Sequence, residues 1–293
     1  RFCEQSERPS RATPICQLDA LGAMSNVMEA KDDLPIKTDQ PVYRGKVRAV
    51  YWLTKEDSAR PMQERGYDVA PGAPRAVMVI SDRISAFGCT WRGGGGVNGG
   101  PLKGASLNAG SNVCFRLMKE KGLGETHMLG VPQSVVWVVR KARPQKCEAV
   151  GRQCLQGSGG REIGGLETPD GMTENPKLGE SHNTPAIRGG GNGNACYVGN
   201  ISRSDIEKNY KAFNFTATDD IDTYEKMVVE CFSVISKALA DLDQILVDTK
   251  FEVGYVTDSR GEEKLIYIDE VGTPDGSLIW DGLAHRTLDE HGG

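Results

Sequence analysis

One stretch near the C-terminus constrains the fold most, because it joins a long amphipathic helix to a β-hairpin. Apolar residues recur at spacings of three and four over 222–242, which predicts a helix with one face packed on a sheet. The segments 245–256 and 264–271 are typical of two strands, and the polar turn between them contains Gly261. A helix beside antiparallel strands places the chain in the α/β class, more narrowly α+β.

Shorter elements precede this stretch. Strands are expected at 42–52, 76–80, 135–139 and 148–155, with helices at 108–121 and 205–213. Residues 81–87 are expected to be an exit loop. Between 157 and 199 no period is sustained and glycine is abundant, which is typical of a loop that covers a substrate.

Composition excludes several classes of protein. The chain has 293 residues, 38% of them hydrophobic, but no apolar run of membrane-spanning length. Its net charge of −5 and few aromatic residues disfavour nucleic-acid binding through the glycine-rich loops. Eight dispersed cysteines without a CxxC motif argue against a zinc site and favour the reducing cytoplasm. His127 and His182 lack metal-like partners nearby in the sequence, and we expect surface or structural roles for both.

The N-terminal residues resemble neither a targeting signal nor a domain. Residues 1–23 lack an apolar core and a helical period. A start at Met24 and a native disordered extension both remain open. We expect 1–33 to lie outside the folded lobes.

Charged residues alternate along the first strand of the hairpin. Asp248, Lys250 and Glu252 are two residues apart and should share one face of the strand. If the hairpin closes symmetrically, Asp269 approaches Glu252 as a cross-strand neighbour, and two such carboxylates require a cation between them. Mg²⁺ completed by phosphate oxygens meets that need. An ordinary solvated strand face is the alternative.

Two other places offer groups that suit phosphates. Lys46 and Arg48 should lie on one side of a strand, and Gly45 lets the backbone approach a ligand. The spacing matches neither a P-loop nor a dinucleotide site, so a surface strand with two basic residues is the alternative. Arg152 and Ser158 flank a strand exit where a phosphate monoester could be held.

Several motifs follow one another between residues 34 and 282. In order they are YRGKVRAVYWL (43–53), SDRISAF (81–87), KGASLNAGS (103–111), RKARP (140–144), EAVGR (148–152) with GS (157–158), PDGMTENPKL (169–178), GNIS (199–202), VDTKFEVGY (247–255) and YIDEVGTPDGS (267–277). In this order and spacing the chain resembles the SAICAR synthetase family, and most closely its longer bacterial subclass.

The resemblance implies a fold and a reaction. The fold is two α/β lobes related to the ATP-grasp enzymes, built of antiparallel sheets with packed helices. Residues 34–145 would form the lobe on the nucleotide side, and 146–293 the second lobe, with the substrate loop at 157–199. ATP would phosphorylate the carboxylate of carboxyaminoimidazole ribotide, and the amine of L-aspartate would then displace phosphate. These small molecules are the implied partners, without nucleic acid or membrane, and a homo-oligomer remains open.

The resemblance also implies roles for particular residues. Those on the ATP side are Gly45, Lys46, Arg48, Glu148 and Arg188. The Mg²⁺ ligands are Glu252 and Asp269, and the catalytic residues are Lys250 and Asp248. The substrate contacts are Arg152, Ser158, Asp248 and Ser85.

The chain also departs from the family pattern. Gly88 stands where the family has Asp, Leu278 where it has Arg, and Arg188 where it has Lys. The family's C-terminal segment is expected to be missing after Gly293. The losses at positions 88 and 278 leave two functions open: the ligase, and a non-catalytic or impaired descendant that still binds nucleotide.

Overall fold

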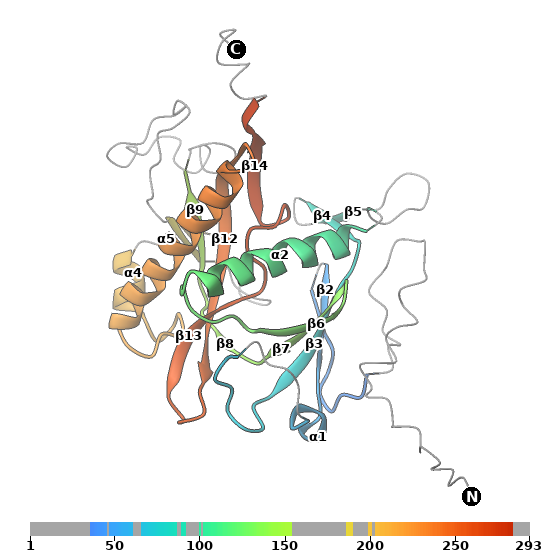
Figure 1. Ribbon diagram of the computed structural model, residues 1–293. Helices are drawn as coiled ribbons and strands as arrows, with labels where there is room; N and C mark the ends of the chain where they lie inside the picture. The colour runs from blue at the N-terminus through green and yellow to red at the C-terminus, as the bar shows by residue number, and fades with distance from the viewer. Residues whose placement is uncertain are drawn as a thin grey trace, which may run out of the picture.

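Two antiparallel sheets dominate the part of the chain that the computed structural model describes (Figure 1). The described residues are 36–45, 47–60, 66–86, 89–91, 100, 102–153, 186–189, 199–200 and 203–283. Helices pack against the sheets, so the expectation of an α+β fold with antiparallel sheets is confirmed.

The first sheet has five strands in the order β1-β2-β3-β7-β6. Their bounds are Tyr43–Arg44 for β1, Arg48–Trp52 for β2, Arg75–Ile80 for β3, Met128–Gln133 for β6 and Val136–Arg140 for β7. The expectation of one strand over 42–52 is wrong, because the chain turns after Arg44 and β2 runs back antiparallel to β1. Arg48 is the first residue of β2, and Lys46 lies outside the described residues. Where an exit loop was expected, β4 (Ile84–Ala86) pairs with β5 (Cys89–Trp91).

The second sheet is organised around the 14-residue strand β12, which pairs with four others. The bounds are Arg143–Pro144 for β8, Glu148–Arg152 for β9, Ala186–Gly189 for β10, Gly199–Asn200 for β11, Gln244–Thr257 for β12, Glu263–Ile268 for β13 and Ser277–Asp281 for β14. The expected hairpin is confirmed as β12 and β13, in register from Glu252 opposite Ile268 to Thr257 opposite Glu263.

Helix α5 (Asp219–Ala240) lies across β9 and β12, close to the expected bounds (Figure 1). Three aspartates in its first turn stabilise the helix, because their negative charges lie at the positive end of the helix dipole. Helix α2 (Lys103–Glu120) begins five residues earlier than expected. Its first turn is held from outside, because the Gly104 amide donates to Asp82 Oδ1 at 2.7 Å. The short helices α1 (Lys55–Ser58) and α4 (Arg203–Lys208) flank the sheets.

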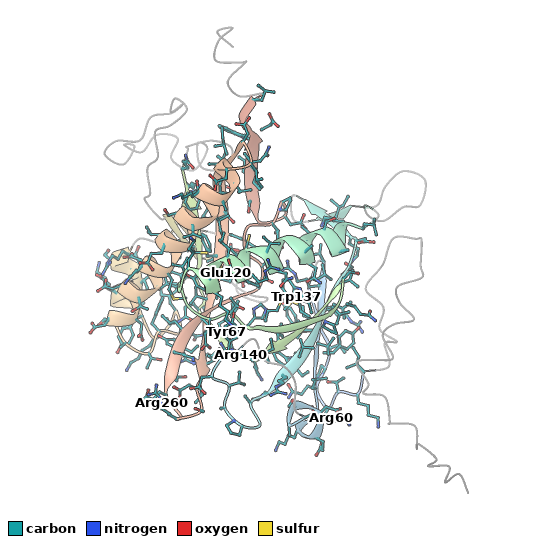
Figure 2. The ribbon with its side chains drawn as sticks, viewed as in Figure 1. Arg60, Tyr67, Glu120, Trp137, Arg140 and Arg260 are labelled. Atoms are coloured by element: carbon teal, nitrogen blue, oxygen red, sulfur yellow. The ribbon has the colours of Figure 1, made fainter. Side chains whose placement is uncertain are left out.

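One hydrophobic core joins both sheets to both long helices. Trp137, which is labelled in Figure 2, fills it between β7 and α2. The centroid of its ring lies 6.0 Å from that of Phe115 on α2. Phe251, Tyr224 and Tyr267 fill it between the second sheet and α5. Their complete burial fixes the two sheets relative to each other, which determines the shape of the space left between them.

Candidate functional site

A cavity of about 850 Å³ lies between the two sheets. Its apolar lining comes mainly from the first sheet and includes Val50, Met78, Val139 and Ile268. Its charged lining comes mainly from the second sheet and consists of Arg48, Glu148, Lys250, Glu252, Asp269, Glu270 and Asp275 with Arg140 and Lys141. One cavity thus offers both an apolar surface and a dense group of charges, which suits a ligand with a flat ring and phosphates.

Lys250 is the centre of the charged lining. Its Nζ lies 3.3 Å from Glu148 Oε1, 3.2 Å from Glu252 Oε1 and 3.3 Å from Asp269 Oδ2. Strand alternation explains the first two contacts, because Lys250 and Glu252 lie on one face of β12 and the intervening Phe251 is buried in the core. Glu148 begins β9 beside Glu252, since the next residue, 149, pairs with Phe251.

Asp269 reaches this face only through an unusual backbone conformation. The hairpin register pairs Glu252 with Ile268, so the expectation that Asp269 is the direct cross-strand neighbour of Glu252 is wrong. A regular strand would turn Asp269 toward the opposite, core face, together with Tyr267. Instead its φ is +59°, and the left-handed residue turns the carboxylate back to Lys250. Glu252 and Asp269 therefore both contact Lys250, although they are not cross-strand neighbours.

Arg48 joins the first sheet to the charged group. Its Nη1 lies 2.5 Å from Asp269 Oδ1, and its Nη2 forms an ion pair with Glu270 Oε2. The sequence reasoning assigned no role to Glu270. Its signal was its place beside Asp269, but the expectation that Asp269 faces Glu252 makes alternation direct Glu270 to the opposite face. Gly45, at the turn before β2, donates its amide to the Arg48 carbonyl at 2.8 Å.

The electrostatics of the group follow from burial and mutual charge. Burial, and then the charge of Asp269, raise the pKa of Glu252 to about 7. Burial also acts to raise the pKa of Asp269, but Arg48 and Lys250 outweigh it and hold that pKa below its usual range. Burial disfavours the Lys250 ammonium, yet the carboxylates raise its pKa, so it remains charged.

His127 lines the cavity, and it is a structural residue rather than a surface residue. It is only 4% exposed, and burial lowers its pKa to about 4. Its ring meets those of Phe115 and Trp137 edge-on, and among the described residues neither ring nitrogen has a hydrogen-bond partner. The imidazole is therefore a neutral polar group at the edge of the core.

A second polar group crosses the sheet at Asp248. The register places Asp248 opposite Arg152 on one side and opposite Leu278 on the other. The Arg152 Nε lies 4.0 Å from Asp248 Oδ2, and the Leu278 amide donates to Asp248 Oδ1 at 3.1 Å. We call Arg152, Asp248 and Leu278 the cross-strand row. Three residues selected from distant motifs thus lie side by side.

The remaining expected site residues are only partly described. The backbone of Arg188 pairs with that of Glu148 between β10 and β9, and Ser85 belongs to β4 opposite Thr90. Outside the described residues lie Lys46, Gly88, Ser158 and His182.

The described part of the chain holds neither a ready-made metal cluster nor a membrane-spanning helix. Within it, His, Cys, Asp and Glu side chains form no group of three or more arranged to bind a metal ion on their own. No described helix is long and apolar enough to cross a membrane. A metal held at Glu252 and Asp269 would therefore need further ligands, such as phosphate oxygens.

Comparison with known sequences identifies relatives over most of the chain. The family model for SAICAR synthetase matches residues 41–291. Proteins named phosphoribosylaminoimidazole-succinocarboxamide synthase include one from Shewanella pealeana, 55% identical over 272 residues, and one from Aeromonas salmonicida, 56% identical over 272 residues. Each alignment covers 89% of this chain and 74% of the relative.

Solved structures share the fold at lower identity. A type-2 SAICAR synthetase in complex with ADP has a TM-score of 0.57 and 21% identity, over 86% of this chain and 91% of that one. The SAICAR synthase of Saccharomyces cerevisiae complexed with SAICAR has a TM-score of 0.60 and 21% identity, over 88% and 81%. These similarities support the fold.

Proposed function

Since the chain belongs to the SAICAR synthetase family and catalyses the ATP-dependent ligation of L-aspartate to carboxyaminoimidazole ribotide in purine biosynthesis, we propose that the charged cavity is the site of this reaction. The observation that carries the proposal is the cluster around Lys250, which we call the Lys250 group: Arg48, Glu148, Lys250, Glu252, Asp269 and Glu270. It places two cations and several carboxylates beside an apolar surface in one cavity.

The chemistry requires such a group. A carboxylate is a poor electrophile, so one of its oxygens first attacks the γ-phosphorus of ATP, and ADP leaves with the electrons of the broken bond. The aspartate amine then attacks the acyl carbon, phosphate departs, and the nitrogen loses a proton. Lys250 and Arg48 are placed to stabilise negative charge on the transferring phosphoryl group.

The nucleotide is assigned to the whole length of the cavity. The solved relative with ADP supports use of ATP in this family. We assign the phosphates to Arg48 and Lys250, together with Gly45 and Lys46. The aliphatic surface of Val50, Met78 and Val139 suits the flat face of a base. The proposed ATP-side residues from the second sheet are Glu148 and Arg188.

The residues present fit a divalent cation. The carboxylates of Glu148, Glu252, Asp269 and Glu270 face two cations, Arg48 and Lys250, which leaves two excess negative charges. Burial, and then the negative charge of Asp269, raise the pKa of Glu252. We assign Mg²⁺ to Glu252 and Asp269. When bound, it would neutralise charge on the phosphates.

The ribotide is assigned to the cross-strand row. Arg152 is buried and lies on the same sheet face as Asp248. Asp248 precedes Lys250 by two residues on β12. A phosphate monoester held by Arg152 and Ser158 would place the imidazole carboxylate toward the Lys250 group, and Ser85 is also assigned to the substrate. Asp248, between the two groups, is assigned to substrate and catalysis. Leu278 stands where the family has Arg, so this site has one cation fewer than the family pattern.

The proposed lobes follow the sheets, 34–145 with the nucleotide side and 146–293 with the ribotide side, except that β8 already belongs to the second sheet.

The test of the proposed function is a coupled assay for ADP release. Dependence on both ribotide and aspartate would support the site assignment in the intact ligase. ATP binding by calorimetry without such turnover would support the impaired, nucleotide-binding alternative.

A further inference from the structure

Glu270 differs from the other carboxylates of the cavity in how firmly it is held. The residue is 4% exposed, and its Oε2 pairs with the Arg48 guanidinium. The hydroxyl of Thr273, which is fully buried, donates to the same oxygen at 2.6 Å. A buried carboxylate with a charged partner and a hydroxyl donor is costly to move, because the loss of either partner leaves a buried polar group unsatisfied.

The backbone after β13 is shaped to bring Glu270 to Arg48. Consecutive residues of a strand point to opposite faces, yet Asp269 and Glu270 contact the same guanidinium. The left-handed conformation of Asp269 makes this possible. A second left-handed residue, Gly272 at φ +66°, then turns the chain so that Thr273 returns to Glu270.

The same segment, residues 269–276, also holds the strand that carries Lys250. The Lys250 amide donates to the Gly276 carbonyl at 2.9 Å, and the Gly276 amide donates to the Thr273 carbonyl at 3.0 Å. Asp275 Oδ2 lies 2.5 Å from Lys103 Nζ, which ties the segment to the start of α2. Arg48 and Lys250 come from different sheets, and this segment contacts both.

We propose that Glu270 is a positioning residue that fixes the Arg48 guanidinium relative to Lys250, and that Thr273 holds Glu270 for this purpose. The proposal rests on the assignment of the phosphates of ATP to these two cations. Asp269 contacts both cations and is partly open to the cavity, so it can exchange them for a ligand. Glu270 is enclosed and keeps its partner, which preorganises the site before phosphoryl transfer.

The decisive variant is Glu270→Gln, which keeps the size and the acceptor for Thr273 but removes the charge facing Arg48. We expect kcat to fall about tenfold or more, because the transferring phosphoryl group loses an aligned cation. We expect the dissociation constant of ATP from calorimetry to change less than about threefold, because Arg48 keeps its charge. The ³¹P NMR resonances of bound ATP should shift, which reports the phosphate environment without turnover.

The position of Thr273 supplies an independent pair of variants if Glu270→Gln fails to fold. Thr273→Val should lower kcat less than Glu270→Gln does and should shift the same resonances. Thr273→Ser keeps the hydroxyl and should have the kcat and the resonances of the parent chain. The matched control is Glu263→Gln, which removes a carboxylate paired with Arg143 on the exposed end of β13 and should leave every reading unchanged.

The possible results separate this proposal from the assigned reaction. Unchanged kcat and unchanged resonances in Glu270→Gln and Thr273→Val would overturn the positioning role, even if the parent chain is a fully active ligase. So would a loss of ATP affinity as large as the loss of kcat. A parent chain that binds ATP without turnover would support the impaired, nucleotide-binding alternative, while the resonances of bound ATP would still decide the role of Glu270.

Discussion

The Lys250 group and the cross-strand row lie on the same face of β12, but they are built differently. In the Lys250 group the charges hold one another, since Lys250 contacts three carboxylates and Asp269 contacts two cations. In the row, Arg152 and Asp248 are 4.0 Å apart and the third member, Leu278, is apolar. The first region is preorganised for charge by the protein itself, whereas the second offers a phosphate less positive charge than the family pattern provides.

The largest effect should come from removing the centre of the preorganised region. Lys250→Met leaves Glu148, Glu252 and Asp269 without their shared cation, and we expect turnover in the coupled assay to fall about 10²- to 10³-fold. The control is Lys264→Met, which removes a lysine paired with Glu125 away from the cavity lining. Equal activities of Lys250→Met and Lys264→Met would show that Lys250 is not the centre of a catalytic group.

A smaller loss should follow from neutralising Asp269 without changing its backbone. Asparagine tolerates the left-handed conformation, so Asp269→Asn isolates the charge, and we expect kcat to fall about thirty- to hundredfold. Thermal melting should move by only a few degrees. A melting shift much larger than this, with normal kcat in the surviving folded protein, would show that Asp269 serves stability alone.

The cross-strand row should respond in the opposite direction. Leu278→Arg adds a cation opposite Asp248, and we expect the ribotide to bind about tenfold more tightly while ATP binding stays unchanged. Titration of both ligands into parent and variant measures the effect. If the parent already binds the ribotide tightly and the variant binds no better, position 278 is not part of a phosphate site.

The smallest effect should be a pH-dependent change in stability at Glu252. Its pKa is about 7 in the fold against an ordinary value of 4.5, so between these pH values the folded state holds more protons than the unfolded chain. Rising pH therefore removes stability in this window. In metal-free buffer, the melting temperature of Glu252→Gln relative to the parent should be a few degrees higher at pH 8 than at pH 5. A constant difference would contradict the raised pKa.

Local patterns predicted the hairpin, the helix α5 and the shared face of Lys250 and Glu252, because each depends on periodicity within one element. They missed the first turn of α2, because its capping carboxylate, Asp82, comes from another segment. They also missed Glu270, because the expected register placed Asp269 opposite Glu252, and alternation from there directs Glu270 to the other face. The break at Asp269 depends on a single backbone angle that no period reveals.

The sequence alone determined which residue types occur in which order, and that was sufficient for the family, the α+β class and the candidate charges. Only the tertiary structure decided which charges meet. Arg48 is separated from Asp269 by 221 positions, and their 2.5 Å contact exists because a common core fixes the two sheets. Side-chain alternation is a local property of the backbone, but the distance between residues on different sheets is set by packing of the whole molecule.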